Sequence, residues 1–287
     1  MHISGTTALL GLIGTPVEHS KSPAMYNHCF AQFGLDWAYL AFDVPPERAG
    51  AAVQAIRTLN MRGANVTMPC KNAVIPYLDR ITPAAQAIQA VNTIVNEDGV
   101  LVGHNTDGCG YTQNLRRSGV EVAGKKIVLL GGGGAASAIA IQSALEGAAE
   151  IAVFNLRDEF WPRVEQGLAA ISAAAPGCAI TLRDLDDKDA LKDAIDHCDI
   201  LSNATRVGMA PFEDQSVITD RSWFRPDLIV TDVVYSPAET KMLREAKAAG
   251  CRTCDGLGML LCQGAEAFRL YSGLEMPVEE IRALLYT

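Results

Sequence analysis

The chain has 287 residues, 49% hydrophobic and 20% charged, which is ample apolar material for about two globular domains and excludes a disordered chain. Its 24 lysines and arginines against 33 aspartates and glutamates leave a net charge of −9, which argues against nucleic-acid and anionic-membrane partners. No apolar stretch approaches the roughly 18 residues of a membrane span, and no basic segment precedes the N-terminal apolar run, so we expect a cytoplasmic protein.

The first part of the chain alternates short apolar runs with helical stretches. We expect strands at 9–14, 38–44 and 63–68, and helices at 22–33, 46–59, 71–78 and 83–90. Ser22 has the character of a helix N-cap, with Pro23 at the first helical position. Asp98 and Gly99 lie between two β-rich runs and predict a hairpin over 92–105. Strands separated by helices predict a mostly parallel sheet with an antiparallel addition.

A second series begins near residue 125. An apolar strand is expected at 125–130, then a glycine turn at 131–136 and an alanine-rich helix at 137–147. Further strands are expected at 150–155, 179–184, 199–205 and 228–234, with helical or loop segments between them. An amphipathic helix at 259–272 and a short terminal helix follow. This alternation predicts a Rossmann-like, doubly wound α/β domain.

The glycine turn fits the pattern G-x-G-x-x-A between a strand and a helix. Gly131 allows the tight turn, Gly133 lets a pyrophosphate approach the backbone, and Ala136 keeps helix and sheet close. Backbone N–H groups at the start of the helix then face the phosphates. The pattern predicts dinucleotide binding; the alternative is a structural turn that binds nothing.

Asp158 lies 24 residues after Gly134, near where an acidic residue usually meets the adenosine ribose. Its carboxylate would accept hydrogen bonds from the ribose of NAD and repel the 2′-phosphate of NADP. Arg157 beside it could still tolerate that phosphate. The alternative for Asp158 is a solvated acid in a loop.

Lys71 follows a strand and a proline in the first part of the chain, and Asp107 lies at the expected domain junction. A lysine with an acid to orient it suits proton transfer to a hydroxyl or a carbonyl. A surface lysine and a turn aspartate are the alternative. Eight scattered cysteines and five histidines show no complete metal-ligand spacing, so we expect no metal; the pair Cys251 and Cys254 is interpreted as free thiols.

Several motifs then occur in the order found in one known family. They are GLIGTPVEHSKSPAMYN (11–27), NVTMPCK (65–71), AVNTI (90–94), GHNTDG (103–108), VLLGGGGAA (128–136), NATRVGM (203–209), VVYSPAETK (233–241) and DGLGMLLCQGA (255–265). Together they resemble the shikimate dehydrogenase family over essentially the whole chain. The segment NLRDEF (155–160) resembles the quinate/shikimate dehydrogenase branch, because Leu156 stands where the NADP-specific branch carries an arginine.

The resemblance implies a role for each matching position. Lys71 and Asp107 match the catalytic pair. The positions that match substrate contacts are Ser20 and Ser22 for the ring carboxylate, Thr67 and Asn92 (with Asp107) for ring hydroxyls, and Tyr235 and Gln263. The positions that match cofactor contacts are Gly131, Gly132, Gly133, Gly134, Ala135, Asn155, Arg157, Asp158, Thr205, Arg206, Val233, Gly256 and Met259. The implied organisation is an α/β substrate domain over 1–107, completed by helices at 259–287, and an NAD(P)-binding domain over 108–258.

The resemblance also implies the reaction. We expect an oxidoreductase that interconverts shikimate and 3-dehydroshikimate, quinate and 3-dehydroquinate, or both, with NAD preferred and NADP used more weakly. The partner is a small ring hydroxy acid, and the chain is a monomer or a homodimer. The relative preference for the two acids stays open. Two alternatives are a dehydrogenase of the same fold for another ring acid, such as one of an aminoshikimate pathway, and a ligand sensor without enzymatic activity.

Overall fold

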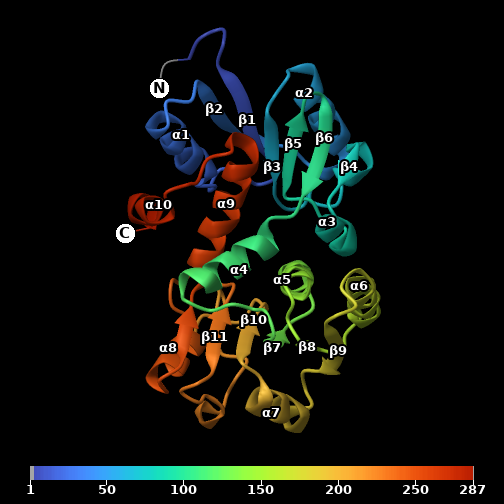
Figure 1. Ribbon diagram of the computed structural model, residues 1–287, viewed down its shortest axis with the longest axis vertical. Coiled ribbons are helices and arrows are strands. Elements are labelled where there is room, and N and C mark those ends of the chain that lie inside the picture. Colours follow the sequence, from blue (N-terminus) through green and yellow to red (C-terminus); the bar gives the residue numbers. More distant parts are fainter. Residues whose placement is uncertain (1–2, 287) are drawn as a thin grey trace. The chain divides into compact units, whose positions relative to one another are not determined.

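A computed structural model describes residues 3–286 (Figure 1). The chain forms two compact units: the first comprises the residues up to Thr106 together with those from Gln263 on, and the second comprises Asp107–Cys262. The expected domain boundaries are 107/108 and 258/259, and the two compact units meet at 106/107 and 262/263. Within the described residues, no helix is both long and apolar enough to cross a membrane.

The first unit is built on a six-stranded mixed sheet. Its strands are β1 (Ala8–Gly14), β2 (Trp37–Asp43), β3 (Gly63–Val66), β4 (Arg80–Ile81), β5 (Thr93–Glu97) and β6 (Val100–His104), in the order β2-β1-β3-β5-β6-β4. Strand β1 pairs in parallel with β2 and β3, whereas β5 is antiparallel to β3 and β6. Asp98 and Gly99 both have positive φ, of 52° and 96°, as a two-residue hairpin turn requires. The predicted mixed sheet is confirmed.

Helices pack on this sheet through apolar side chains. The helical segments are η1 (Pro46–Arg48), η2 (Ile75–Tyr77), α1 (Ser22–Gln32), α2 (Ala49–Thr58), α3 (Pro83–Ile88), α10 (Val278–Tyr286) and the last part of α9 (Gly256–Ser272). Val53 and Ile56 of α2 join a core with Ile94 of β5. Tyr26 of α1 donates a hydrogen bond to the carbonyl of Gly264 in α9 (3.0 Å), so the end of the chain packs against its beginning.

Three expectations for the first unit need correction. Residues 71–78 form turns followed by η2 rather than an α-helix, because Pro76 has no N–H to donate to the carbonyl of Asn72. Lys21, not Ser22, is the N-cap residue of α1, and the Ser22 N–H instead donates to Ser20 Oγ (3.2 Å). The third strand ends at Val66, before the turn at 68–70, and the short strand β4 was not expected.

The second unit is built on an all-parallel sheet. Its strands are β7 (Lys126–Leu130), β8 (Glu150–Asn155), β9 (Ala179–Asp184), β10 (Ile200–Asn203), β11 (Ile229–Asp232) and β12 (Arg252–Cys254), in the order β12-β11-β10-β7-β8-β9. In chain order this is 6-5-4-1-2-3, the strand order of the Rossmann fold, so the predicted doubly wound domain is confirmed. Strands β8 and β9 follow β7 on one side of it, and β10, β11 and β12 lie on its other side, so the strand order changes direction between β7 and β10. In such sheets, ligands bind outside the carboxyl ends of the strands at that point.

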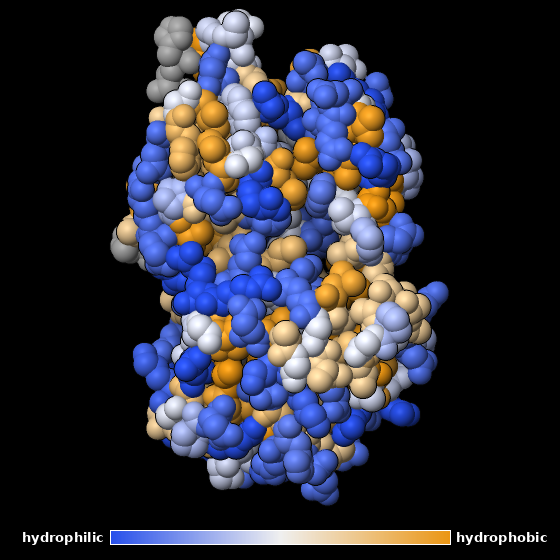
Figure 2. All heavy atoms as spheres, viewed as in Figure 1, coloured by the Kyte–Doolittle hydropathy of each residue, from blue (hydrophilic) through white to orange (hydrophobic). Residues whose placement is uncertain are grey.

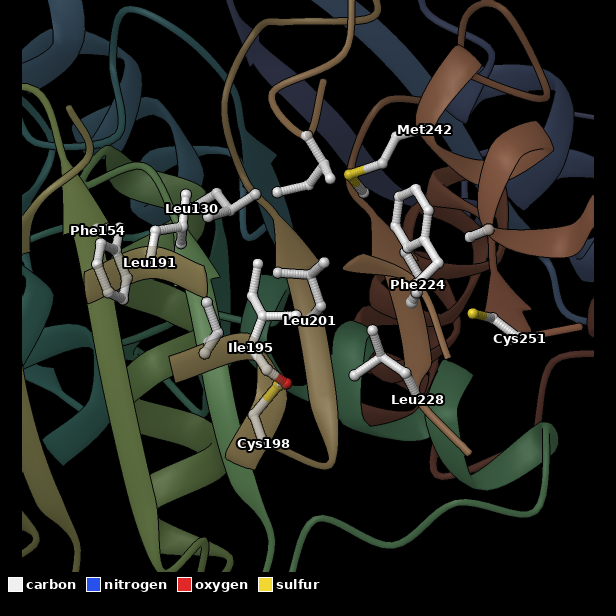
Figure 3. Close-up of a cluster of buried hydrophobic side chains, with 14 of the residues drawn as sticks. Leu130, Phe154, Leu191, Ile195, Cys198, Leu201, Phe224, Leu228, Met242 and Cys251 are labelled. Atoms are coloured by element: carbon white, nitrogen blue, oxygen red, sulfur yellow. Dashed lines mark hydrogen bonds between the residues drawn. The ribbon is translucent and has the colours of Figure 1, made fainter. Parts of the chain in front are cut away.

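Apolar side chains cover both faces of this sheet. The helices are α4 (Asp107–Arg117), α5 (Gly134–Leu145), α6 (Trp161–Ala174), α7 (Lys188–His197), α8 (Lys241–Ala248) and the short η3 (Arg221–Trp223). Leu191 of α7 and Met242 of α8 share one core cluster with Leu130 and Leu201 of the strands (Figure 3). Ile127 and Leu129 alternate with the β7 residues of that cluster and are also fully buried, on the opposite face.

The helix boundaries of the second unit differ from the expected ones. Helix α5 begins at Gly134 instead of residue 137, and α9 begins at Gly256 instead of 259. Helix α4 was not expected, because Gly108 and Gly110 disfavour helix on propensity alone. A Cβ at Gly108 would lie 2.3 Å from the carbonyl oxygen of Ala138 in α5. Close helix packing, which requires glycine there, therefore overrides propensity.

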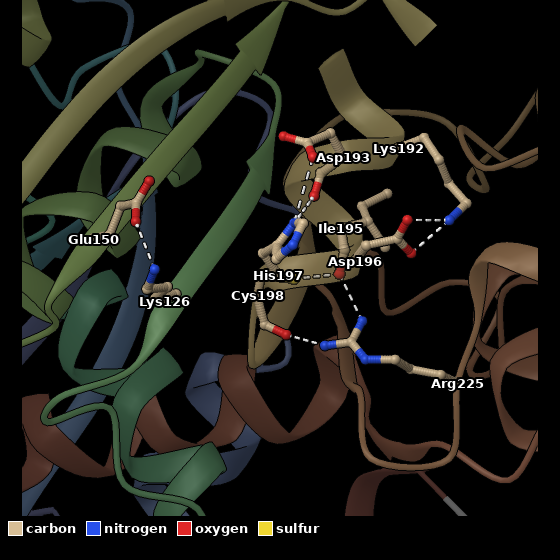
Figure 4. Close-up of polar contacts among 9 residues, drawn as sticks. All are labelled: Lys126, Glu150, Lys192, Asp193, Ile195, Asp196, His197, Cys198 and Arg225. Atoms are coloured by element: carbon tan, nitrogen blue, oxygen red, sulfur yellow. Dashed lines mark hydrogen bonds and ion pairs between the residues drawn. The ribbon is translucent and has the colours of Figure 1, made fainter. Parts of the chain in front are cut away.

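Ion pairs and helix-end contacts occupy the amino edge of the second sheet (Figure 4). Lys126 at the start of β7 pairs with Glu150 at the start of β8 (3.4 Å). Arg225 donates to the carbonyl oxygens of Ile195 (2.6 Å) and Cys198 at the C-terminal end of α7. Figure 2 shows one face of the whole chain, and hydrophilic side chains cover much of it.

Candidate functional site

A buried set of polar side chains lies in the sheet of the first unit. We call Tyr39, Asn65, Asn92, Thr93 and Thr106 the polar cluster; each is at most 7% exposed. Tyr39 donates to Asn65 Oδ1 (2.8 Å), and Asn65 Nδ2 donates to Thr93 Oγ1 (3.2 Å). Asn92 Oδ1 accepts from the Thr106 N–H (2.8 Å), and its Nδ2 lies 3.0 Å from Thr106 Oγ1. Because buried amides and hydroxyls are costly unless paired, these contacts hold each side chain in one orientation.

The polar cluster lies where several candidate residues converge. The Val91 N–H donates to the carbonyl of Lys71 (2.9 Å), and the Val66 N–H donates to the carbonyl of Asn92 (2.7 Å). These bonds bring Lys71, Thr67 and Asn92 to one edge of the sheet, after β3 and before β5. Thr106 Oγ1 lies 3.4 Å from Gln263 Oε1 of α9, which adds Gln263 to the same edge.

Ser20 and Ser22 follow the neighbouring strand β1. Strands β1 and β3 are parallel, so the loop that carries the two serines leaves the same sheet edge as the segment that carries Lys71. Both serines are partly exposed, and Ser20 Oγ accepts the Ser22 N–H at the start of α1. Hydroxyls at a helix start suit an anionic group such as a carboxylate.

Asp107 is the first residue of α4 and therefore of the second unit, directly after Thr106 of the polar cluster. Its carboxylate lies in the first helical turn, where the helix dipole favours a negative charge. Chain connectivity joins Asp107 to the polar cluster, while Lys71 belongs to the first unit.

The glycine turn of the second unit has two parts. Gly131 has a φ of +96°, and a Cβ there would lie 3.1 Å from Thr205 Cγ2; a Cβ at Gly132 would lie 2.7 Å from the side chain of Val164 and 3.2 Å from Asn155. These two glycines are required by the protein's own packing. At Gly133 and Gly134, in contrast, a Cβ would meet no neighbouring atom within 4 Å, and both residues are exposed.

This open backbone fits a phosphate group. Helix α5 begins at Gly134, and its N-cap residue Gly133 provides no side-chain cap for the first N–H groups. Uncapped N–H groups and the positive end of the helix dipole attract an anion. Ala135 follows them, and Ala136 is buried against the sheet, as the dinucleotide-binding pattern requires.

The end of β8 carries the candidate ribose residues. Asn155 Nδ2 donates to the carbonyl of Leu156 (2.8 Å), and Leu156 is 46% exposed. Asp158 is exposed, and its Oδ1 accepts the Phe160 N–H (3.0 Å), which fixes the carboxylate in the loop before α6. The Arg157 guanidinium lies over the ring of Trp161 (4.9 Å to the centroid), and its Nε is 3.6 Å from Asp184.

The loops after β10 and β11 carry the remaining candidates of the second unit. Thr205 is held by Asn203 and Arg206 is exposed; Val233 and the 51% exposed Tyr235 follow β11. A Cβ at Gly256 would lie 2.5 Å from the carbonyl oxygen of Val233, so only glycine allows α9 to begin there. Met259 is buried in the first turns of α9.

Several polar residues of these sites were not among the site residues predicted from the sequence. Asn65 and Thr106 connect the polar cluster, and Asn203 and Asp232 end neighbouring strands of the second unit. Burial raises the pKa of the Asp232 carboxyl to about 6, although hydrogen bonds from Val234, Thr240 and Asn203 oppose the shift. The sequence signal of Asn203 and Asp232 is a polar residue at the last position of a buried strand. Among the described residues, no group of three or more histidine, cysteine or acidic side chains could hold a metal ion.

Comparisons with known proteins agree with this geometry. Residues 12–94 match the shikimate dehydrogenase substrate binding domain, and residues 256–286 match the shikimate 5'-dehydrogenase C-terminal domain. A shikimate dehydrogenase (NADP(+)) of Listeria monocytogenes is 46% identical over 284 residues, covering 99% of this chain and 97% of the relative. A quinate/shikimate dehydrogenase of Escherichia coli is 43% identical over 285 residues, covering 99% of both chains.

Solved structures show the same fold. The crystal structure of shikimate 5-dehydrogenase from Listeria monocytogenes, in complex with shikimate and NAD, matches with a TM-score of 0.96 at 46% identity. The match covers 100% of this chain and 99% of that one. Sequence identity of 43–46% over nearly the whole chain is sufficient to assign the family. The chain belongs to the shikimate dehydrogenase family.

Proposed function

We propose that this chain is an NAD(P)-dependent dehydrogenase that oxidises the C3 hydroxyl of shikimate, and of quinate, to the ketone and catalyses the reverse reaction. The first unit, with the polar cluster, binds the ring acid, and the second unit, with the glycine turn, binds the dinucleotide. Family membership supports the reaction class, and the relatives' names support shikimate and quinate as substrates.

The observation that carries the proposal is the open pair Gly133 and Gly134 at the start of α5. The protein packs tightly around Gly131 and Gly132 but leaves space beside these two, at the carboxyl edge of a sheet with Rossmann strand order. A pyrophosphate fits this arrangement because the backbone N–H groups there need an anionic acceptor. The same chain carries Lys71 and the polar cluster in addition to this glycine turn, which supports a dehydrogenase over a protein that only binds a dinucleotide.

Each polar residue of the first unit then has a chemical task. Ser20 and Ser22 hold the ring carboxylate, and Thr67, Asn92 and Gln263 accept or donate hydrogen bonds to ring hydroxyls. The Lys71 amine takes the proton of the C3 hydroxyl during oxidation, and the resulting ammonium returns it during reduction; Asp107 orients the hydroxyl and the Lys71 side chain. Tyr235 of the second unit also contacts the substrate.

The bound dinucleotide supplies the hydride acceptor, nicotinamide C4. The residues of the second unit bind and orient it: Gly131 to Ala135 hold the pyrophosphate, Asn155 to Asp158 surround the adenosine ribose, and the nicotinamide half is held by Thr205, Arg206, Val233, Gly256 and Met259. A negatively charged carboxylate at Asp158 favours a ribose with two free hydroxyls.

We also propose a preference for NAD over NADP. Leu156 offers no charge to a 2′-phosphate, and the neighbouring Arg157 stacks on Trp161 close to Asp184. Binding a 2′-phosphate would require Arg157 to leave these contacts and would bring the phosphate close to Asp158. The Listeria relative carries NADP(+) in its name, whereas the Listeria crystal structure contains NAD, so measurement on this chain decides the preference.

The test is a set of initial-rate measurements at 340 nm on the full chain, with shikimate and quinate each combined with NAD and NADP. We expect reduction of the dinucleotide with shikimate and NAD, and a kcat/KM for NAD about tenfold or more above that for NADP. The Lys71→Ala variant is the negative control: it keeps the residues proposed to bind both ligands, and we expect its rate to be much lower than that of wild type. Absence of reduction with all four combinations would contradict the proposed reaction; equal kcat/KM values would contradict only the NAD preference.

A further inference from the structure

Asp232 is a carboxylate buried at the carboxyl end of β11, with only 3% of its surface exposed. Its Oδ1 accepts hydrogen bonds from Asn203 Nδ2 and from the Val234 N–H, both at 3.0 Å. Its Oδ2 accepts the hydroxyl of Thr240 at 2.7 Å. These partners lie in three different segments, and each of them is a neutral donor.

Asn203 extends these contacts into the loop after β10. It lies opposite Asp232 in the register of the two parallel strands. Its Oδ1 accepts the N–H (3.1 Å) and the hydroxyl (2.7 Å) of Thr205, and its Nδ2 also donates to the carbonyl of Val207 (3.1 Å). The orientation of the Asn203 amide is therefore set on one side by Asp232 and on the other by the loop.

Thr240 meets the same loop from the other side. It is the N-cap of α8, where its Oγ1 accepts the Leu243 N–H, and it is fully buried. A Cβ at Gly208 would lie 3.2 Å from Thr240 Cγ2, and Gly208 has a φ of +102°. Asp232 is thus connected to the segment 205–208 in two ways: by its hydrogen bond with Asn203 and by its hydrogen bond with Thr240, which packs against Gly208.

The third contact of Asp232 acts on its own loop. The Val234 N–H points back to the carboxylate, and this fixes the direction of the chain between Val233 and Tyr235. The carbonyl oxygens of Val233 and Val234 then lie 2.5 and 2.4 Å from where a Cβ of Gly256 would be. The start of α9 is therefore packed against the same loop.

We propose that Asp232 is a positioning residue that joins the loop after β10 to the loop after β11, so that both take the one arrangement that receives the nicotinamide half of the dinucleotide. The inference rests on the proposed function, which assigns Thr205, Val233 and Gly256 to that half. A buried charge held by neutral donors is expensive, so its contribution is the ordering of the two loops rather than net stability.

Titration calorimetry of the full chain tests this inference with two probes. The first is NAD or NADP, whichever wild type binds more tightly, and the second is ADP, which reaches the glycine turn and the ribose site but not the two loops. We expect Asp232→Ala to raise the Kd of the dinucleotide about tenfold or more and to change the Kd of ADP by less than about twofold. Asp232→Asn keeps the volume and one acceptor, and we expect about a threefold rise.

The matched control is Asp199→Ala at the amino edge of the same sheet. Asp199 accepts hydrogen bonds from the Lys126 N–H (2.9 Å) and from Lys125 Nζ (3.0 Å), so the variant also removes a carboxylate that connects two strands. Its dinucleotide affinity should equal that of wild type. If Asp232→Ala does not fold, Asp232→Asn decides alone.

Two results would overturn the positioning role while the proposed function stands. One is an unchanged dinucleotide affinity in the Asp232 variants; the other is an equal loss for ADP and for the dinucleotide, which indicates a general structural defect. Wild type that binds ADP but neither NAD nor NADP would overturn the inference together with the proposed function.

Discussion

The candidate sites of the two units are built in opposite ways. In the first unit, the candidate site is built from buried side chains: Asn65, Asn92 and Thr106 are each at most 7% exposed and are connected by hydrogen bonds. In the second unit, the exposed backbone at Gly133 and Gly134 is the proposed recognition element, and the space where their side chains would be is open. This difference matches the ligands that we propose for the two units, a ring acid for the first and a dinucleotide for the second.

A ring with several hydroxyls is distinguished from similar rings by donors and acceptors in fixed positions, which requires side chains that cannot rotate. A pyrophosphate is recognised by its charge, and backbone N–H groups at a helix start suffice for it. Changes in the first unit should therefore alter substrate chemistry and specificity, and changes at Gly133 and Gly134 should alter dinucleotide affinity alone.

The largest effect is expected for Lys71→Ala. Loss of the proton acceptor should lower kcat by about 10²–10⁴, with a small change in the KM of the substrate. Initial rates at 340 nm give both constants, and calorimetry with the dinucleotide should show wild-type affinity. A near-normal kcat would remove Lys71 from proton transfer.

The second effect concerns the carboxylate of the substrate. Replacing Ser20 and Ser22 together by alanine removes two hydrogen bonds to a charged group, about 3 kcal/mol in total, or about a 100-fold rise in KM. The kcat should change much less, because the ground state and the transition state share carboxylate binding. An unchanged KM would place the carboxylate elsewhere.

The third prediction compares two neighbouring glycines. Gly133→Ala adds a methyl group in open space, so its Tm should equal that of wild type, while dinucleotide affinity falls about 30-fold because the backbone can no longer approach the pyrophosphate. Gly132→Ala brings a methyl group 2.7 Å from Val164 and should cost about 1–3 kcal/mol of stability. Thermal unfolding and calorimetry separate the two outcomes. A Gly133→Ala variant with unchanged affinity would remove the turn from dinucleotide binding.

The smallest effect concerns the choice of cofactor. The double variant Asp158→Ala, Leu156→Arg replaces a repelling carboxylate by an attracting guanidinium, so the ratio of kcat/KM for NADP to that for NAD should rise by about tenfold or more, about 1.4 kcal/mol. Asp158→Ala alone, the control, should show a smaller rise. A ratio that does not move in the double variant would mean that the 2′-phosphate is bound by other residues.

The sequence predicts the second unit better than the first. Its central strands contain continuous apolar runs such as 127–130, and buried parallel strands have this pattern regardless of the rest of the fold. In the first unit, residues 71–78 have a helical spacing of apolar residues, but Pro76 removes one hydrogen bond and the segment folds as turns. Helix α4 was missed for the opposite reason, because the packing of Gly108 against α5 depends on residues 30 positions away.

The candidate site shows the same limit. Motifs predict roles for Lys71, Asp107 and the glycine turn, because the proposed role of each depends on its own chemistry. Asn203 and Asp232 act through each other, and their contact arises only when β10 and β11 pair in parallel, because the two residues are 29 positions apart along the chain. The register that places Asn203 opposite Asp232 could not be predicted from the sequence, so the sequence did not single out these two residues.

The transfer of a labelled hydride tests the proposed reaction most directly. The full chain is incubated with shikimate deuterated at C3 and with NAD, and the reduced dinucleotide is analysed by mass spectrometry. We predict one deuterium in each molecule of reduced dinucleotide, because the hydride passes directly from the ring carbon to the nicotinamide. Reduced dinucleotide without deuterium, or no reduced dinucleotide at all with wild-type protein, would contradict the account.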